Sequence, residues 1–250
     1  MPNNVTNEIK FYGQPEDIKT VRSLIKGSKD DLPMIDFNRL IPMPKSLNIE
    51  EGSMTRDAIR LYLTMMNPDA PHHDENPMSR ERFGAVTRKL STMIYMRYTP
   101  ILSEEKIREM TRNTNVDDLL DLGAKAVYNL MKYGAVSWYD WRVSHWGTKW
   151  NAYYQYSDSD DSIGFDTAWS MPEPILRKLA EICNEHNVRF DGQWINEDWR
   201  SDSGSFESND DVLYVYPDET EEQARERCKD LLNWDSIEDE NDEENSDEDN

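Results

Sequence analysis

The chain contains little of three things: cysteine, positive charge and long apolar sequence. Its two cysteines, Cys183 and Cys228, cannot form a disulfide framework, and both fall on apolar stripes as expected of inert thiols in a reducing compartment. Lysine and arginine total 28 against 50 aspartates and glutamates, so the net charge of -22 argues against a nonspecific grip on nucleic acid or on an anionic membrane. No apolar run approaches the roughly 20 residues of a membrane span, and residues 1–12 lack the layout of a signal peptide. We therefore expect a cytoplasmic protein with no membrane partner.

The sequence also lacks the motifs that usually mark catalysis or cofactor binding. It has no phosphate-binding loop, dinucleotide fingerprint, nucleophile elbow or zinc-protease motif. The run 72–75 (His-His-Asp-Glu) places its side chains next to one another and not at the spacing of zinc ligands. Asp158, Asp160 and Asp161 lack the central glycine and final glutamate of a calcium loop, so they indicate a solvated turn. We expect no catalytic residue, no metal and no cofactor.

Residue patterning predicts an α+β fold. Apolar and polar residues alternate at the period of a half-buried strand in several stretches, and other stretches repeat apolar residues at helical spacing. Thr220 and Gln223 have the spacing of a capping box at the start of the last helix. The predicted strands are 5–12, 35–41, 150–156, 163–169, 188–194 and 212–216, and the predicted helices of this part are 15–26, 173–183 and 221–232.

The order of these elements predicts a ferredoxin-like split βαβ sandwich with strands to spare, its helices covering one face of an antiparallel sheet. This domain comprises 1–52 and 135–234. The segment 53–134 is predicted to be a mainly helical insertion. It holds eight of the 12 methionines. We expect them to fill gaps in the core, and an adaptable binding surface is the second interpretation.

The last segment, 235–250, carries ten acidic residues and no basic one. It has one apolar residue, Ile237, and cannot bury enough surface to offset the entropy of ordering, so we expect it to be disordered. Two interpretations stay open: a solubilising tail, or a lure for a basic surface on a partner. The acidic residues proposed for partner contact are Glu238, Asp239, Glu240, Asp242, Glu243 and Glu244.

A tryptophan-rich block lies between residues 138 and 150. If 137–146 is helical, residues three and four apart share faces of that helix. Core packing is the simplest interpretation, an aromatic interface patch is the second, and a base-stacking platform is the third. The block's candidate partner-binding residues are Trp138, Tyr139, Trp141, Arg142, His145, Trp146 and Lys149.

Several stretches resemble a family of phage- and plasmid-encoded proteins that carry a YubB-like ferredoxin domain. The residues that carry the resemblance are Asn3-Asn4-Val5-Thr6-Asn7, Ile35-Asp36-Phe37-Asn38, Ile41-Pro42-Met43-Pro44, the block from Gly134 to Ala152, and Phe165 to Ile175. The resemblance implies a mobile-element origin and a ferredoxin-like fold, and it supplies no catalytic residues. Segment 53–115 and the acidic tail depart from it.

The functional expectation combines this context with the acidic surface. We predict a non-enzymatic phage or plasmid accessory protein that binds and inhibits a host protein in the host cytoplasm, with a nucleic-acid-handling defence component as the first candidate. Carboxylates can occupy a site built for phosphates, because arginine and lysine pair with either. The alternatives are an enzyme of unrecognised type with a pocket near the tryptophan block, and a nucleic-acid-binding module on the sheet face.

Overall fold

The computed structural model describes residues 3–27, 34–70, 76–93, 102–112 and 114–232. The chain divides into two compact units, which we call the sheet unit (1–42 and 146–250) and the helical unit (43–145). The helical unit is longer at both ends than the predicted insertion, so residues 43–52 and 135–145 belong to it and not to the sheet domain. The predicted disorder of 235–250 concerns residues outside those described.

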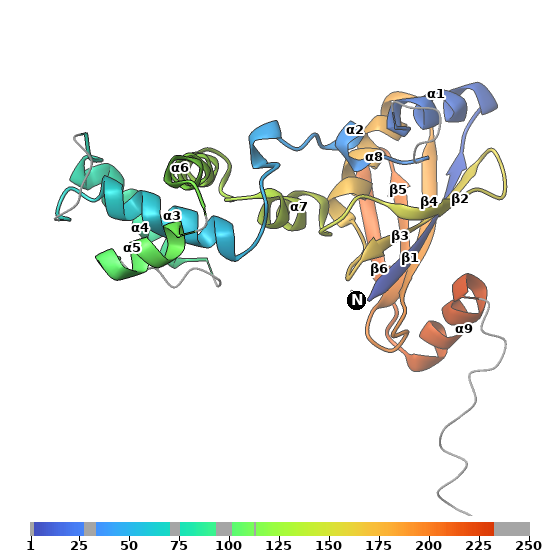
Figure 1. The fold of residues 1–250 in the computed structure, drawn as a ribbon. Helices are drawn as coiled ribbons and strands as arrows, with labels where there is room; N and C mark the ends of the chain where they lie inside the picture. Colours follow the sequence, from blue (N-terminus) through green and yellow to red (C-terminus); the bar gives the residue numbers. More distant parts are fainter. Residues whose placement is uncertain (1–2, 28–33, 71–75, 94–101, 113, 233–250) are drawn as a thin grey trace, which may run out of the picture. The chain divides into compact units, whose positions relative to one another are not determined.

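Six strands form one antiparallel sheet in the sheet unit, in the order β2-β3-β1-β4-β5-β6 (Figure 1). The chain order β1-α1-β2-β3-α8-β4 and the spatial order β2-β3-β1-β4 are those of the predicted ferredoxin-like split βαβ sandwich, which is thereby confirmed. The hairpin of β5 and β6 extends the sheet beyond β4. The strands are β1 (Asn4–Tyr12), β2 (Tyr153–Tyr156), β3 (Ser162–Ala168), β4 (Arg189–Asn196), β5 (Ser203–Asn209) and β6 (Val212–Pro217).

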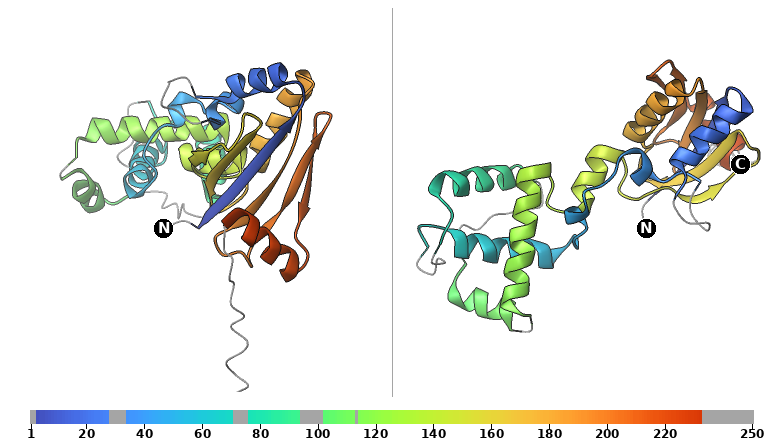
Figure 2. Two further views of the ribbon diagram at one scale, coloured as in Figure 1. Left: turned by 90° about the vertical axis from the view of Figure 1, so that its right-hand side faces the viewer. Right: turned by 90° about the horizontal axis from the view of Figure 1, so that it is seen from above.

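One face of the sheet is buried beneath helices. Along β1 the residues Val5, Asn7, Ile9 and Phe11 are buried while their neighbours are not, which is the period of two that places alternate side chains on opposite faces. The apolar stripes of α1 (Pro15–Ile25) and α8 (Glu173–Glu185) are buried as well. Phe37 of α2 (Phe37–Leu40) packs edge-on against Phe165 of β3. Figure 2 shows the strands of this unit as one twisted layer.

The described residues leave the other face of the sheet open except at one corner. It carries Thr6, Glu8 and Lys10 of β1, none of which is buried. The helix α9 (Glu221–Leu232) covers Ile195, which packs with Ala224 and Cys228. The first turn of α9 is closed by the predicted capping box: Gln223 N–H bonds to Thr220 Oγ1, and Gln223 Oε1 accepts from Thr220 N–H at 3.0 Å.

Aromatic rings lie over three glycines of the sheet, and one of them is Gly192 of β4, which lies under the ring of Phe206 on β5. A Cβ at Gly164 of β3 would collide with the ring of Tyr156 on β2, and a Cβ at Gly204 of β5 would collide with the ring of Trp194 on β4. Each ring fills the space that a side chain on the neighbouring strand would otherwise take. These contacts fix where the rings of Tyr156 and Trp194 lie.

The helical unit is held by a largely aliphatic core. Its buried residues include Ile59 and Leu63 of α3, Leu90 of α4 and Leu130 of α6. The methionines divide: Met78 is buried and Met66 and Met93 pack against this core, whereas others are exposed, so the assignment to the core holds for part of the set. The elements are η1 (Lys45–Leu47), α3 (Ser53–Met66), α4 (Arg80–Ser91), α5 (Glu104–Thr111), α6 (Val116–Tyr133) and α7 (Trp138–Trp146), the last ending at the first residue of the sheet unit. No helix in the described ranges combines the length and the apolar character needed to cross a bilayer.

Two predicted elements need correction. The predicted strand 35–41 is instead the short helix α2, because the Asp36 side chain caps it at Asn38 N–H, and the Ile35 and Phe37 N–H groups bond to the side chains of Gln155 and Asn151. The strand β5 was not predicted, because its sequence Ser-Gly-Ser-Phe-Glu-Ser-Asn is poor in the β-branched residues that favour strands.

Candidate functional site

The tryptophan block does not form one exposed patch. Trp141 and Trp146 are buried, and Trp146 packs edge-on against Phe37 and donates its indole N–H to the carbonyl of Ile41 at 2.9 Å. Their burial assigns both to packing, which corrects their place among the predicted partner contacts. The exposed His145 ring is stacked on Trp141, with ring centroids 4.3 Å apart.

The remaining members of the block are only half-buried. Trp138 lies edge-on against Tyr139 at 5.7 Å, and the Arg142 guanidinium lies 5.0 Å from the Trp138 ring. Burial lowers the pKa of Arg142 from its ordinary value. These three side chains keep some exposed surface, so their predicted contact with a partner stays a prediction.

Lys149 belongs to a second aromatic group, in the sheet unit. Its ammonium lies 4.1 Å from the ring centre of Trp150 and 4.3 Å from that of Trp169. Trp169 has a φ of 74° and Tyr154 a φ of 46°, a left-handed backbone that bulky residues rarely adopt, yet their side chains are 46% and 77% exposed. The backbone thus presents two rings to solvent at a cost in strain.

The other predicted candidates add no site. The run 72–75 and the acidic residues from Glu238 to Glu244 lie outside the described residues. Among those described, no group of three or more His, Cys, Asp or Glu side chains is arranged to hold a metal ion. Cys183 is fully buried, and burial raises its pKa to about 12, which is the environment of an unreactive thiol.

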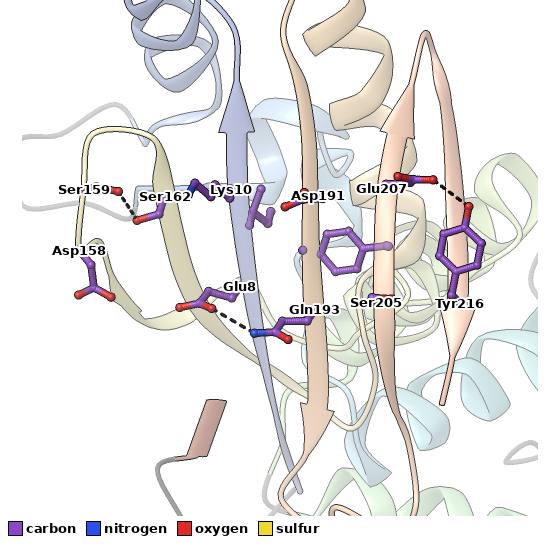
Figure 3. A pocket seen from close by; sticks show the side chains of 13 residues that line it. Glu8, Lys10, Asp158, Ser159, Ser162, Asp191, Gln193, Ser205, Glu207 and Tyr216 are labelled. Carbon is purple, nitrogen blue, oxygen red and sulfur yellow. Dashed lines mark hydrogen bonds between the residues drawn. The ribbon is translucent and has the colours of Figure 1, made fainter. Parts of the chain in front are cut away.

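A groove of about 590 Å³ with a mainly acidic lining lies on the open face of the sheet (Figure 3). Residues from β1, β4, β5 and β6 and from the turn between β2 and β3 line it side by side. Its charged lining consists of four carboxylates and one amine, from Glu8, Asp158, Asp191, Glu207 and Lys10.

Three of these carboxylates accept hydrogen bonds from neutral donors. Glu8 accepts from the hydroxyl of Tyr156 and from the amide of Gln193, both at 3.4 Å. Asp191 accepts from the Tyr12 hydroxyl at 3.2 Å, and Glu207 from the Tyr216 hydroxyl at 2.9 Å. Within the described part of the chain, none of the four groove carboxylates forms an ion pair. Their negative charge is therefore available to a ligand.

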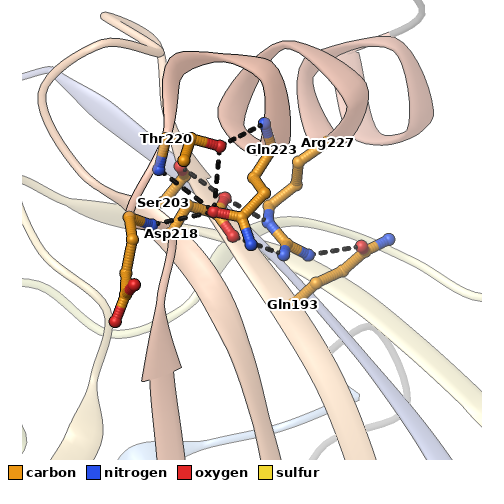
Figure 4. Close-up of polar contacts among 7 residues, drawn as sticks. Gln193, Ser203, Asp218, Thr220, Gln223 and Arg227 are labelled. Carbon is orange, nitrogen blue, oxygen red and sulfur yellow. Dashed lines mark hydrogen bonds and ion pairs between the residues drawn. The ribbon is translucent and has the colours of Figure 1, made fainter.

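A line of polar contacts runs from this groove to α9 (Figure 4). The Arg227 guanidinium donates a hydrogen bond to Gln193 Oε1 at 2.9 Å and one to each carboxylate oxygen of Asp218, both at 2.8 Å. Ser203 Oγ donates to Asp218 Oδ2 at 2.8 Å. The guanidinium lowers the pKa of Asp218, because it stabilises the charged carboxylate. Since Gln193 also donates to Glu8, the same line orients the carboxylate in the middle of the groove.

Burial and neighbouring charges shift the pKa values of two other side chains on this face, Tyr156 and Asp166. Desolvation, with the nearby Glu8 carboxylate adding to it, raises the pKa of Tyr156 to about 12. Desolvation also raises the pKa of Asp166, although a hydrogen bond from the Thr6 hydroxyl opposes that shift. At neutral pH the tyrosine is therefore an uncharged donor.

The net negative charge of the chain lies in the sheet unit as its sequence is divided. Residues 43–145 contain fourteen basic and fourteen acidic residues, so the helical unit has no formal net charge and the whole of the -22 belongs to the sheet unit. The open-face groove lies in the acidic unit, and its four carboxylates form no ion pair with another described residue. Chemically it suits a cationic ligand, above all lysine and arginine side chains.

The groove residues were not predicted as a group from the sequence, and Asp158 was assigned to a solvated turn. The alternation along residues 5–12 did indicate that Glu8 and Lys10 point away from the core. Asp191, Ser205 and Glu207 join them only because β1, β4 and β5 are neighbours in the sheet, and β5 was not predicted.

The sheet unit thus contains a ferredoxin-like α+β domain with an acidic open face. In agreement, residues 149–249 match the family model described as a ferredoxin-like domain in Api92-like protein. The chain is also similar to a crystal structure of a protein api92 from Yersinia pseudotuberculosis, with 11% identity over 88% of this chain and 100% of that chain and a TM-score of 0.37. No curated protein sequence matches the chain.

Proposed function

We propose that the chain is a non-enzymatic binding protein whose open sheet face receives basic side chains of a partner protein. The observation that carries this proposal is the groove with four carboxylates, none of them in an ion pair within the described residues. An arginine or lysine entering the groove meets negative charge without having to displace an internal cation.

The partner is a protein whose basic surface normally handles nucleic acid. Carboxylates spread over a sheet face offer arginine and lysine the kind of charge that a phosphate backbone offers them. By occupying that surface the chain would inhibit its partner. The resemblance to phage- and plasmid-encoded proteins with a YubB-like domain makes a host defence component in the host cytoplasm the first candidate. The acidic residues from Glu238 to Glu244 would act as a second contact by long-range attraction.

Direct binding of nucleic acid by the same face is less favourable. The face does carry exposed tyrosines, among them Tyr214 and Tyr216, which could stack on bases. The four groove carboxylates around them would repel a phosphate backbone, and Lys10 is the single amine among the groove's lining residues.

A competition experiment tests the proposal. An arginine-rich peptide is bound to a fluorescent DNA duplex, and the full-length chain is added at low and at physiological salt. We expect the chain to release the duplex, with an affinity for the peptide that falls as salt rises. Fluorescence anisotropy of the duplex reports the release.

Matched variants locate the contact. The triple variant E8Q/D191N/E207Q should weaken peptide binding about tenfold, which corresponds to about 1.4 kcal/mol, a modest sum for three exposed charges. The control E16Q/E185Q removes exposed carboxylates from α1 and α8 and should bind as the parent does. A third full-length variant, with Gln or Asn at the acidic positions from 238 to 244, measures the share of the tail. If no variant competes differently from the parent, or the parent releases no DNA, the proposal is wrong.

A further inference from the structure

Within the described residues, the strand β6 forms an edge of the sheet that no other strand pairs with. It is the last strand in the order β2-β3-β1-β4-β5-β6, and its described pairing is with β5. In Figure 3 its residue Tyr216 stands at the border of the groove. Val212, Tyr214 and Tyr216 alternate along it on the open face and are 44%, 44% and 49% exposed.

The backbone of this edge has capacity for another strand. In an antiparallel pair, alternate residues direct their N–H and C=O groups away from the partner strand. Among the described residues, no backbone hydrogen bond joins Val212–Pro217 to anything other than β5. Such a row of free donors and acceptors is a template for pairing with another chain.

The edge also lacks the usual protection against such pairing. Natural edge strands are blunted by lysine, by an inward-pointing charge, by proline or by a bulge. The sequence Val-Leu-Tyr-Val-Tyr-Pro holds no charged residue, its proline stands at the end, and its register with β5 is regular over all six residues. By contrast, the opposite edge strand β2 has an irregular register, and Gln155 hydrogen-bonds the backbone of Ile35 beside it.

Charge decides which chain can occupy the edge. Asp210 and Asp211 form the turn before β6, and the exposed Glu219 follows the strand; Asp218, which precedes Glu219, is already paired with Arg227. If two copies paired antiparallel through β6, the turn of one copy would lie opposite residues 218–219 of the other, and like charges would face each other at both ends. A segment with basic side chains meets the opposite situation, since carboxylates flank the edge on both sides.

We propose that β6 accepts an extended basic segment of the partner protein as a seventh strand of the sheet. This inference rests on the proposed function and names its mode of binding. Basic residues at every second position of the added strand would stand on the open face beside Tyr214 and Tyr216, whose ring faces attract cations, and would reach toward Glu207. Backbone pairing supplies affinity, and the alternation supplies the preference for basic residues.

Backbone-blocked peptides test strand addition separately from charge attraction. The probes are an eight-residue peptide alternating threonine and arginine and two analogues, one N-methylated at the threonines and the other at the arginines. All three have the same charge. Since only one edge of an added strand pairs with β6, one methylated set should reduce binding to the full-length chain at least tenfold and the other should bind as the parent peptide does.

Hydrogen exchange locates the added strand. The parent peptide should slow amide exchange within 212–217, while exchange within the opposite edge strand 153–156 is unchanged. The variant Y214S/Y216S should bind the parent peptide about tenfold more weakly, and Y154S, which removes a more exposed tyrosine at the other edge, should bind it normally.

The outcomes separate the two proposals. If all three peptides bind equally and 212–217 is not protected, strand addition is wrong although the acidic groove still binds cations. If no peptide binds even at low salt, the proposed function fails and strand addition with it. If 212–217 is protected without peptide and sedimentation gives a dimer, a second copy occupies the edge and the proposal is overturned.

Discussion

The two units of this chain differ in how their charged side chains are balanced and paired. In the helical unit, charged side chains balance one another and several pair along a helix, as Arg60 does with Asp57 and Arg108 with Glu104. In the sheet unit, three of the groove carboxylates accept hydrogen bonds from the neutral side chains of tyrosine and glutamine. Of the net charge of -22, residues 235–250 contribute -10 and the rest of the sheet unit contributes -12, while residues 43–145 contribute none. The part of the sheet unit that carries the groove is therefore more acidic than the helical unit.

Their interiors differ as well. The largest buried side chains of the sheet unit are aromatic, among them Phe11, Phe165 and Trp146, whereas the helical unit is packed with leucine, isoleucine, valine and methionine. Flat rings fill the gap between a sheet and the helices above it. Helices approach one another closely over small residues, as at Gly123 of α6, where a Cβ would collide with the backbone of α3. Each core is suited to its own layer geometry.

The largest expected effects come from emptying each core in turn. Phe165→Ala should destabilise the sheet unit by about 3–5 kcal/mol, and Leu63→Ala the helical unit by about 2–5 kcal/mol, because each leaves a cavity in a fully buried site. Hydrogen exchange resolved along the chain during denaturant unfolding measures both. Loss of protection in both units from either substitution would mean that they unfold as one body, and the division into two units would lose its thermodynamic meaning.

The next largest effect compares the stability contributed by a buried ion pair, Arg227 with Asp218, and by an exposed one, Arg80 with Asp69. Arg227→Gln should cost about 2 kcal/mol, since it removes a two-pronged partner from Asp218, whose side chain is 6% exposed. Arg80→Gln in the helical unit breaks a pair in which both side chains are exposed, and no measurable change is expected. Urea unfolding of both variants is compared with Lys229→Gln, an exposed change on the same helix as Arg227. Equal losses for Arg227 and Arg80 would contradict the structure.

A pH series distinguishes two carboxyls of the sheet unit. Asp218 has a lowered pKa, so its contribution is fully present above its ordinary pKa of about 3.8 and is lost as pH falls through its lower folded value. Asp166 has a raised pKa, so burial of its charge destabilises the fold above that raised pKa. At pH 7 we expect D218N to lose about 1–2 kcal/mol and D166N to be neutral or slightly stabilised. Unfolding curves from pH 7 to pH 3 should show both differences shrinking, that of D166N first; the reverse order would refute the assignment.

The smallest expected effect comes from removing the cation–π contacts of two lysines, Lys149 and Lys132. Lys149→Met should cost about 1 kcal/mol, because the ammonium lies within 4.3 Å of two tryptophan ring centres. Lys132→Met in the helical unit should matter less, since that ammonium lies 5.3 and 5.2 Å from the rings of Tyr128 and Tyr133 at an exposed site. Thermal unfolding of the two variants measures the difference. A larger loss for Lys132 would show that ring distance does not rank the two sites.

Much of the fold could be predicted from local pattern. The strand at residues 4–12 shows clear alternation, and the cap at Thr220 has a short-range cause, so both are legible in a few consecutive residues. The segment 35–41 could not be assigned correctly, because its β-compatible residues are held by Gln155 and Asn151, more than a hundred residues away. Residues 203–209 form a strand because β4 and β6 flank them, and their own composition gives no such indication.

The candidate site was harder to predict than the fold for the same reason. The tryptophan block is conspicuous in sequence because its residues are consecutive, yet Trp141 and Trp146 are interior. The groove is invisible in sequence because Glu8, Asp191 and Glu207 are far apart along the chain and meet only through the strand order. Composition shows the excess of acidic residues, and the strand order brings four of their carboxylates together in the groove.

Two of the glycines covered by aromatic rings constrain how this sequence can change. A side chain larger than hydrogen at 164 or 204 requires the ring of Tyr156 or Trp194 to move away, and loss of either ring uncovers bare backbone. The nearest atoms to a Cβ at 164 are all in the Tyr156 ring, so Gly164 and Tyr156 behave as one heritable unit, whereas a Cβ at 204 would also meet the backbone oxygen of Tyr216. In a deep mutational scan, single substitutions at both glycines should score poorly, while double substitutions that restore a side chain and shrink the ring should recover at 164 and not at 204.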